Sequence, residues 1–394
     1  MKVLVVLENH FIKDKNNIIW CDRVVDYNFL QRYLNVFDEV IVSGRCQRTT
    51  DIVKNKLLVS GENIEFVELP DFKGIKGLII NLLEIKKILR GVISQVDCII
   101  YRAPTHLSLF TYKEVLKQKK PLALEFMMAA DKMVEGNNLI NKIIKMITQN
   151  MCMKVNGVAY VTEEILQKDY PCRAIKYGEN KKYFTGSYST IDLIDEDFFD
   201  QKWNCKKVPQ KIQIIHTGYM DSYRKGQHTL IKAIKIVKEK GYNIKLTLIG
   251  DGQKRSEFEN MVRELGIDEI VEFKGLIKNK KEVLEYLRKS HLLVFPTQSE
   301  GLPRTIIEAM AQGLPCLSSP VDGIPELLDE EFLIDYNDVE GYANKIIELI
   351  NNWDKMVMIS KENYIKSKKY NRNILNSKRC EFYKKLKGLS ENDF

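Results

Sequence analysis

The sequence predicts an α/β protein with two domains, each built on a parallel sheet. Short apolar runs typical of buried strands alternate with segments whose apolar residues recur at helical spacing, and this alternation indicates βαβ units. The pattern weakens over residues 192–208, which are first acidic and then basic, and it starts again afterwards. A length of 394 residues is enough for two domains, each with its own core.

The first half of the chain provides most of the predicted elements. Strands are predicted over residues 2–7, 39–43, 64–69, 98–102, 122–126 and 157–161, helices over 23–37, 78–93, 107–118 and 138–155, and a loop over 8–17. The helix at 138–155 has one strongly apolar side and carries Lys142 and Lys145 on another. Such a helix either packs on the core or faces a membrane.

Composition and charge narrow the class of protein. With 44% hydrophobic and 29% charged residues the chain is globular. No apolar run approaches the ~20 residues of a membrane span, and no leader is recognisable after Met1, so we expect a cytoplasmic protein. The eight cysteines contain no Cys-x-x-Cys pair. We therefore expect free thiols rather than a zinc site or disulfides.

Most of the net charge of +8 lies at the end of the chain. Residues 355–394 hold eleven Lys or Arg against four acidic residues, an excess of seven. This segment either faces solvent or attaches the protein to an anionic membrane surface on the inner face of the cell membrane. No nucleic-acid partner is expected, because no known binding motif accompanies the charge.

The second half restarts with strands that end in glycine. The strand at 212–217 is followed by Gly218, the strand at 245–249 by Gly250, and a strand at 271–276 includes Gly275 and Leu276. Lys225 and a glycine then precede a helix with apolar residues over 230–237. A lysine at such a helix start suits a diphosphate, although a surface lysine would give the same pattern.

The stretch from Ser299 to Gly313 is the centre of the predicted site. It follows an apolar strand at 292–296 and enters a helix, with Pro303 at the first helical position and Gly313 just past the end. The free N–H groups of the first turn favour an anion.

Two glutamates flank this helix start, Glu300 in the preceding loop and Glu308 on the second turn. Carboxylates accept hydrogen bonds from hydroxyl groups, so the predicted ligand is a diphosphate with a sugar ring on either side. In the alternative interpretation Glu300 is solvated and Glu308 pairs with Arg304 at i, i+4.

This stretch resembles the motif of two glutamates separated by seven residues in retaining glycosyltransferases of family 4, of the bacterial surface-polysaccharide type. The resemblance covers roughly residues 212–330. It implies the GT-B fold, with two Rossmann-like domains whose parallel sheets face a central cleft. In that family the first glutamate, here Glu300, faces the donor sugar, the second, here Glu308, holds the ribose, and Lys225 binds donor phosphate.

The resemblance also implies further donor contacts, many of them through the backbone. These positions are Gly218, Gly250, Gly275, Leu276, Gly301, Leu302, Pro303 and Thr305. The domains implied are an acceptor-binding domain over 1–200, a nucleotide-sugar-binding domain over 209–365, and a basic helix over 366–394 that crosses back to the first.

The chain departs from the family in three places. The first loop lacks paired glycines, and Tyr219 stands where an arginine is usual, with Arg224 as a candidate substitute. A histidine is missing from the first domain, where Glu125 and Asp131 are the polar groups available. We take Glu125 as the third catalytic residue, beside Glu300 and Lys225, with His10 and His106 as alternatives.

The predicted activity is transfer of a sugar from a UDP- or GDP-linked donor to the hydroxyl of a glycan or lipid-linked acceptor, with retained configuration. No cofactor or metal is expected, since Asp195 and Asp197 lie in a linker. The first alternative is a catalytically silent subunit that supports a partner enzyme. A phosphorylase or epimerase of the same fold is a second, although no pyridoxal phosphate motif is present.

Overall fold

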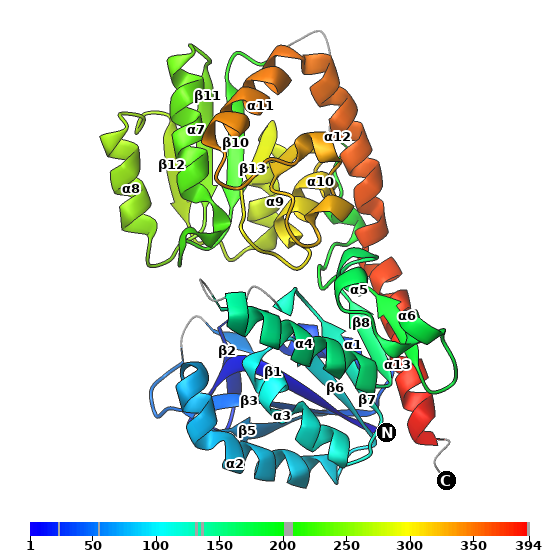
Figure 1. Cartoon of the computed structure of the whole chain (residues 1–394). Coiled ribbons are helices and arrows are strands. Elements are labelled where there is room, and N and C mark those ends of the chain that lie inside the picture. The colour runs from blue at the N-terminus through cyan, green and yellow to red at the C-terminus, as the bar shows by residue number, and fades with distance from the viewer. Residues whose placement is uncertain (23, 54–55, 131–132, 135–137, 201–207, 392–394) are drawn as a thin grey trace. The chain divides into compact units, whose positions relative to one another are not determined.

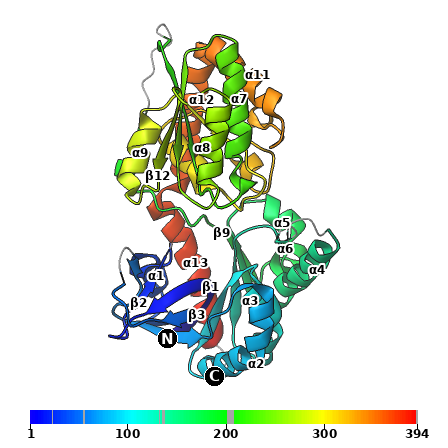
Figure 2. The ribbon, with the colours of Figure 1, turned by 90° about the vertical axis from the view of Figure 1, so that its left-hand side faces the viewer.

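The computed structural model describes residues 1–22, 24–53, 56–130, 133–134, 138–200 and 208–391. The chain forms two compact units, unit 1 with Met1–Tyr188 and Asn376–Phe394, and unit 2 with Ser189–Leu375. Each unit is a sheet with helices on both of its faces (Figures 1 and 2).

Unit 1 contains a nine-stranded sheet. Seven parallel strands run in the order β5-β3-β1-β6-β7-β8-β9, and the antiparallel strands β2 and β4 extend it beside the end of β1. The strands are β1 (Lys2–Lys13), β2 (Ile19–Cys21), β3 (Glu39–Arg48), β4 (Leu57–Leu58), β5 (Ile64–Leu69), β6 (Cys98–Ala103), β7 (Leu122–Phe126), β8 (Gly157–Tyr160) and β9 (Phe184–Ser187).

Helices α2, α3 and α4 cover one face of this sheet, and α1 lies on the other (Figure 2). Thr105 and Ser108 form a capping box at the start of α3, and Asp26 caps α1. The helices are α1 (Tyr27–Leu34), α2 (Gly74–Ile93), α3 (His106–Lys117), α4 (Asn138–Lys154), α5 (Ile165–Asp169) and α6 (Arg173–Tyr177).

The prediction of a loop over 8–17 is wrong for residues 8–13, because β1 continues to Lys13. The register shifts between Val6 and His10, and beyond this irregularity β1 pairs with β2 as well as β3. Phe11 is fully buried in this extension. Its burial explains why the strand does not end at the polar residues that suggested a loop.

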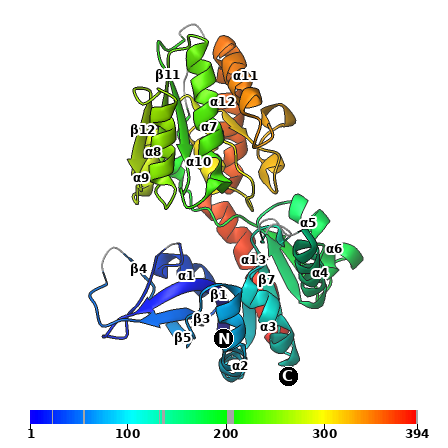
Figure 3. The same cartoon turned by 60° about the vertical axis from the view of Figure 1, so that its left-hand side comes forward.

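Unit 2 contains a parallel sheet in the order β12-β11-β10-β13-β14. Figure 3 shows α7 and α11 side by side. The strands and α-helices of unit 2 are β10 (Ile212–Thr217), α7 (Gln227–Glu239), β11 (Ile244–Ile249), α8 (Arg255–Glu264), β12 (Val271–Gly275), α9 (Lys280–Arg288), β13 (Leu292–Phe295), α10 (Arg304–Ala311), β14 (Cys316–Ser318), α11 (Val339–Asn351) and α12 (Trp353–Ser367).

Unit 2 begins earlier than the predicted limit at residue 200. Asp197 is 4% exposed, and its carboxylate pairs with Lys280 Nζ at 2.5 Å. Asp195 accepts a hydrogen bond from Asn371 Nδ2 at 2.7 Å. Both aspartates therefore anchor the first segment of unit 2 to later parts of the same unit.

The last helix, α13 (Arg372–Glu391), is basic but packed. Phe382, Tyr383 and Leu386 are buried in unit 1. Lys385 pairs with Glu179 at 3.2 Å and Lys378 with Glu163 at 3.5 Å. The excess charge found in the sequence is thus partly compensated by acidic residues from distant parts of the chain.

Two expectations from composition can be compared with the structure. The seven cysteines within the described ranges are free thiols, as predicted. Among the described residues, every helix is too short or too polar to cross a bilayer.

Candidate functional site

The candidate site lies at the carboxyl edge of the unit 2 sheet, where the strands end in glycines. A Cβ on Gly250 (φ 141°) would lie 2.0 Å from the carbonyl oxygen of Gly218, and one on Gly226 (φ 76°) would lie 1.8 Å from that of Pro296. These approaches leave room only for glycine. The turns after β10 and β11 therefore pack closely and expose backbone at the edge where α/β proteins bind ligands.

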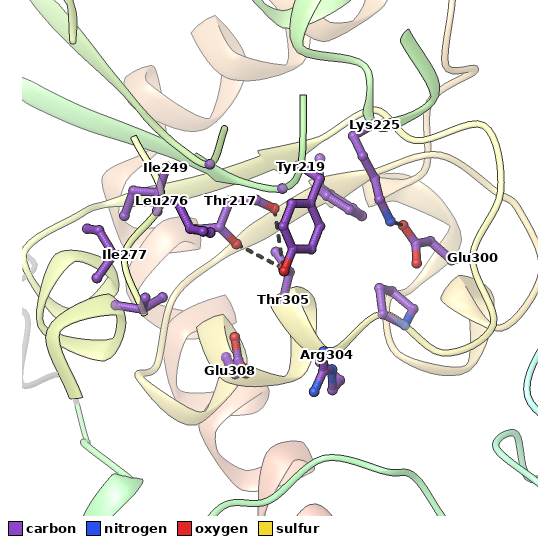
Figure 4. Close-up of a pocket in the computed structure, with 15 residues that line it drawn as sticks. Thr217, Tyr219, Lys225, Ile249, Leu276, Ile277, Glu300, Arg304, Thr305 and Glu308 are labelled. Carbon is purple, nitrogen blue, oxygen red and sulfur yellow. Dashed lines mark hydrogen bonds and ion pairs between the residues drawn. The ribbon is translucent and has the colours of Figure 1, made fainter. Parts of the chain in front are cut away.

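A pocket of about 300 Å³ opens at this edge (Figure 4). Its apolar end is formed by Ile249, Leu276 and Ile277, and its other end by Lys225 and Glu300. The remaining lining residues are Thr217, Gly218, Tyr219, Gly250, Val283, Phe295, Pro303, Arg304, Thr305 and Glu308.

Lys225 and Glu300 form an ion pair inside this pocket. Their side chains are only 19% and 13% exposed, and the ammonium lies 5.5 Å from the ring centre of Phe295. The backbone N–H of Glu300 donates to the Asp322 carboxylate at 2.6 Å. The pair is therefore held by the surrounding structure rather than free in solvent.

The loop that carries Lys225 is anchored by residues that the sequence analysis did not single out. His216 Nε2 lies 2.9 Å from the carbonyl oxygen of Lys225, and Gln227 Nε2 donates to the carbonyl oxygen of Tyr219 at 3.1 Å. Burial lowers the pKa of His216 to about 4, so the imidazole is neutral at pH 7. Both side chains are fully buried, and this burial is not visible in the sequence.

Helix α10 begins at Arg304, one residue later than predicted, and Pro303 is its N-cap. No side chain caps this end. Thr305 in the first turn is tied to β10, with its Oγ1 2.8 Å from Thr217 Oγ1. Gly313 has φ 65° and follows the helix end as expected. The first turn of α10 thus points its backbone N–H groups toward the pocket.

Glu308 lies on the second turn of α10 and is partly exposed. Burial raises the pKa of its carboxyl, although the charge of Arg304 opposes this. The ion pair of the alternative interpretation is not formed between these two described residues, and Arg304 acts on Glu308 only through its charge. Glu308 is therefore a partly exposed carboxylate without an ion-pair partner in the part of the chain that the structure describes.

The cationic side chains that line the pocket are not all the ones expected from the sequence. Tyr219, which replaces the usual arginine, is 38% exposed and lines the pocket, whereas Arg224 is not among the lining residues. Arg304, which the sequence analysis considered only as a partner of Glu308, lines the pocket instead. Its position at the start of α10 gives the site a second positive charge.

Three predicted contact positions lie outside the pocket lining. The carbonyl oxygen of Gly275 accepts a hydrogen bond from the backbone N–H of Gly250 at 2.9 Å. The carbonyl oxygen of Gly301 accepts one from the backbone N–H of Gly323, also at 2.9 Å. Leu302 is only 9% exposed. The other predicted positions of unit 2 all line the pocket.

Glu125 belongs to the interior of unit 1. It is 5% exposed, and its carboxylate accepts a hydrogen bond from Tyr33 at 2.9 Å and another from Tyr383. Burial opposes ionisation, but Arg102 at 3.3 Å and the hydrogen bonds outweigh it and keep the pKa of Glu125 below its usual value. These contacts are those of a structural carboxylate, which differs from the predicted catalytic role. Asp131 lies outside the described residues.

The two alternative histidines line a separate pocket of unit 1, with a volume of about 520 Å³. His106 lies 3.6 Å from Glu8, which accepts a hydrogen bond from the backbone N–H of Leu107 at 2.7 Å. His10 lies 3.5 Å from Asp71. Arg45 lines the same pocket, which therefore offers both charges to a polar ligand.

Two Rossmann-like units, one with a glycine-rich pocket at the carboxyl edge of its parallel sheet, are the architecture of the GT-B class. A crystal structure of HepE from Anabaena in complex with UDP superposes with a TM-score of 0.67 at 16% identity, over 98% of this chain and all of that one. This likeness establishes the fold.

Sequence comparison then gives the class of enzyme. Residues 197–366 match the family model "Glycosyl transferases group 1". Protein CapJ of Staphylococcus aureus is 28% identical over 345 residues, 86% of this chain and 83% of CapJ. A capsular polysaccharide biosynthesis glycosyltransferase, CapM of the same species, is 34% identical over 132 residues, 32% of this chain and 34% of CapM. The protein is a glycosyltransferase.

Proposed function

We propose that the protein transfers a glycosyl group from a nucleoside diphosphate sugar to a hydroxyl of a glycan or lipid-linked acceptor during surface polysaccharide synthesis, with retained configuration. One observation carries the donor assignment: Lys225, Glu300, Glu308 and the uncapped start of α10 surround one pocket. Retention follows from the resemblance to retaining family 4. The name of CapM supports the polysaccharide context.

The pocket suggests an order for the parts of the donor. The nucleobase would lie against Leu276 and Ile277, the ribose near Glu308, and the diphosphate between the start of α10 and Lys225. HepE was solved with UDP, so UDP is the first nucleotide to test and GDP the second. Isothermal calorimetry with both nucleotides tests the assignment, and absence of binding to either would overturn it.

Donor binding would require Lys225 to exchange partners. In the structure its ammonium pairs with Glu300, and a diphosphate would draw it away and free that carboxylate to accept hydrogen bonds from the donor sugar. Lys225 and the helix start would then stabilise the charge that develops on the leaving diphosphate. The leaving phosphate would take the proton of the acceptor hydroxyl.

We infer that the reaction needs no metal ion. Asp195 and Asp197 have Asn371 and Lys280 as partners within the protein, and charge on the diphosphate can be met by Lys225. Activity should therefore survive EDTA. Loss of activity that manganese or magnesium restores would contradict this inference.

The silent-subunit alternative is favoured by Tyr219 at the position of the family's arginine. It predicts nucleotide binding without turnover. Proton NMR of the product made from a UDP-sugar distinguishes the two, because it reports both transfer and the configuration of the new bond. Binding without any transfer to a panel of glycan and lipid-linked acceptors would favour the silent subunit.

We propose that acceptors bind to unit 1 and that this unit attaches reversibly to anionic membranes. The apolar residues Ile80, Leu83, Leu139 and Met146 on α2 and α4 are 81%, 82%, 70% and 68% exposed. Helix α3 packs against both helices, and all three cover the same face of the sheet (Figure 2). Lysines on α2 and α4 suit anionic headgroups, at ~1 kcal/mol each near the surface.

Vesicle sedimentation at low salt tests this attachment. Ile80→Ser/Leu83→Ser should abolish pelleting with phosphatidylglycerol vesicles and leave UDP binding intact. The prediction places the contact on α2 and α4 rather than on the basic tail, because the tail is largely packed. Failure of the wild-type protein to pellet would mean that these side chains face only solvent.

A further inference from the structure

A wide hollow in unit 1 lies at the amino ends of β7, β8 and β9. Its volume is about 1120 Å³. Pro121, Asn156 and Tyr183, each just before one of these strands, line it. The pocket of Glu8 and His106 lies instead just beyond the carboxyl end of β6 and beside the second half of β1, so the hollow and that pocket occupy opposite sides of the sheet along the strand direction.

Lysines dominate the lining of this hollow. They come from the turn before β7, the end of α4, the segment before β9, and α13. Six of them have no ion-pair partner among the described residues: Lys119, Lys120, Lys154, Lys181, Lys182 and Lys384. The one carboxylate in the lining, Glu179, accepts a hydrogen bond from the backbone N–H of Thr185 at 2.8 Å and pairs with Lys385 at 3.2 Å. Six positive charges therefore converge without compensation.

Some lysines of unit 2 are paired instead. In unit 2, Lys245 pairs with Glu272 at 2.8 Å and Lys366 with Asp329 at 2.9 Å. Like charges brought together in the hollow repel one another, and an anionic ligand would remove this repulsion. The wall is fixed, because the side-chain oxygen of Asn156 accepts a bond from Leu122 N at 3.0 Å. The cluster is therefore built into the fold.

We propose that this hollow binds an anionic glycan, a chain whose carboxylate or phosphate groups are spaced along its length. Lysines from four segments suit spaced charges better than a single small anion. Base stacking needs a row of aromatic rings, and Tyr183 is the one partly exposed aromatic residue of the lining that the structure describes, which argues against nucleic acid. The choice of a glycan rests on the proposed function, with the chain being a distal part of acceptor or product.

Fluorescence anisotropy with a labelled oligogalacturonate tests the proposal, with a neutral malto-oligosaccharide of equal length as the comparison ligand. The variant of the hollow, called the groove variant below, is Lys181→Gln/Lys182→Gln/Lys384→Gln, and it changes exposed residues only. The matched control, Lys232→Gln/Lys289→Gln/Lys361→Gln, removes the same charge from exposed positions of unit 2. We expect salt-sensitive binding of the oligogalacturonate alone, weakened roughly tenfold in the groove variant and unchanged in the control.

Three results would overturn the proposal: no binding of the oligogalacturonate, equal loss in both triple variants, or equal binding of the neutral chain. A separate measurement uses phosphatidylglycerol vesicles in place of the oligosaccharides. If the groove variant loses vesicle binding while the wild type ignores oligogalacturonate, the hollow serves a membrane surface instead. UDP titration of the same proteins separates this question from the donor site, since UDP binding should be equal in all of them.

Discussion

Glu125 in unit 1 is buried and Glu308 in unit 2 is partly exposed, and the groups around the two carboxylates differ as well. Tyrosine hydroxyls and Arg102 surround Glu125 and lower the pKa of its carboxyl. Glu308 has no cationic partner within ion-pair distance among the described residues, and burial raises its pKa. A carboxylate whose partners are all internal stabilises the fold, whereas one left without partners is available to a ligand at some cost in stability.

The strongest test of this comparison is Glu125→Ala. It would leave Arg102 as an uncompensated buried cation, so we expect a loss of ~3 to 5 kcal/mol in the free energy of unfolding. Urea denaturation followed by circular dichroism measures this. A stable variant that binds UDP but has lost turnover would restore the catalytic role predicted from the sequence.

The second prediction concerns the pH dependence of unit 2. The unfolded chain binds a proton at His216 near pH 6.5, but the folded protein resists it down to about pH 4. Stability from this residue is therefore present above pH 6.5 and is lost as the pH falls toward 4, by about 3 kcal/mol. In the His216→Asn variant, the free energy of unfolding should depend less on pH between 6.5 and 4 than in the wild-type protein. An unchanged pH profile would contradict the burial argument.

Much of the fold and part of the site could be predicted because they depend on local pattern. Strand runs followed by Gly218 and Gly250 mark the carboxyl edge, and a parallel sheet brings such ends together without further information. Glu125 shows what local pattern cannot give. Its partner Tyr383 lies 258 residues later, so its role depends on the packing of α13. His216 was missed because a histidine within a strand gives no sign that it supports the loop of Lys225.

The third prediction tests the charge on the donor side. Lys225→Ala should weaken UDP binding by ~1.5 to 3 kcal/mol, roughly tenfold to 150-fold, because it removes a charged hydrogen-bond donor to the diphosphate. Lys232→Ala, an exposed lysine on α7, is the control. Equal affinities in both variants, measured by calorimetry, would remove the phosphate role from Lys225.

The smallest effects distinguish the two glutamates of the pocket. Glu308→Gln keeps an acceptor oxygen but loses the charge, so UDP and the whole donor should each bind about fivefold more weakly, ~1 kcal/mol. Glu300→Gln should not weaken UDP binding, because it leaves Lys225 free to meet the diphosphate, and it should lower turnover because the contact of Glu300 is to the transferred sugar.

The stability of the Glu308→Gln variant is a further test of the role of Glu308. A raised pKa means that ionised Glu308 destabilises the folded state increasingly as the pH rises above the ordinary glutamate value of 4.5. Glu308→Gln should therefore raise the unfolding free energy at pH 7 and raise it by less at pH 4. A surface glutamate would give no gain at either pH and no change in UDP affinity. A gain in stability joined to a loss of affinity is the result expected only of a carboxylate kept unpaired for a ligand.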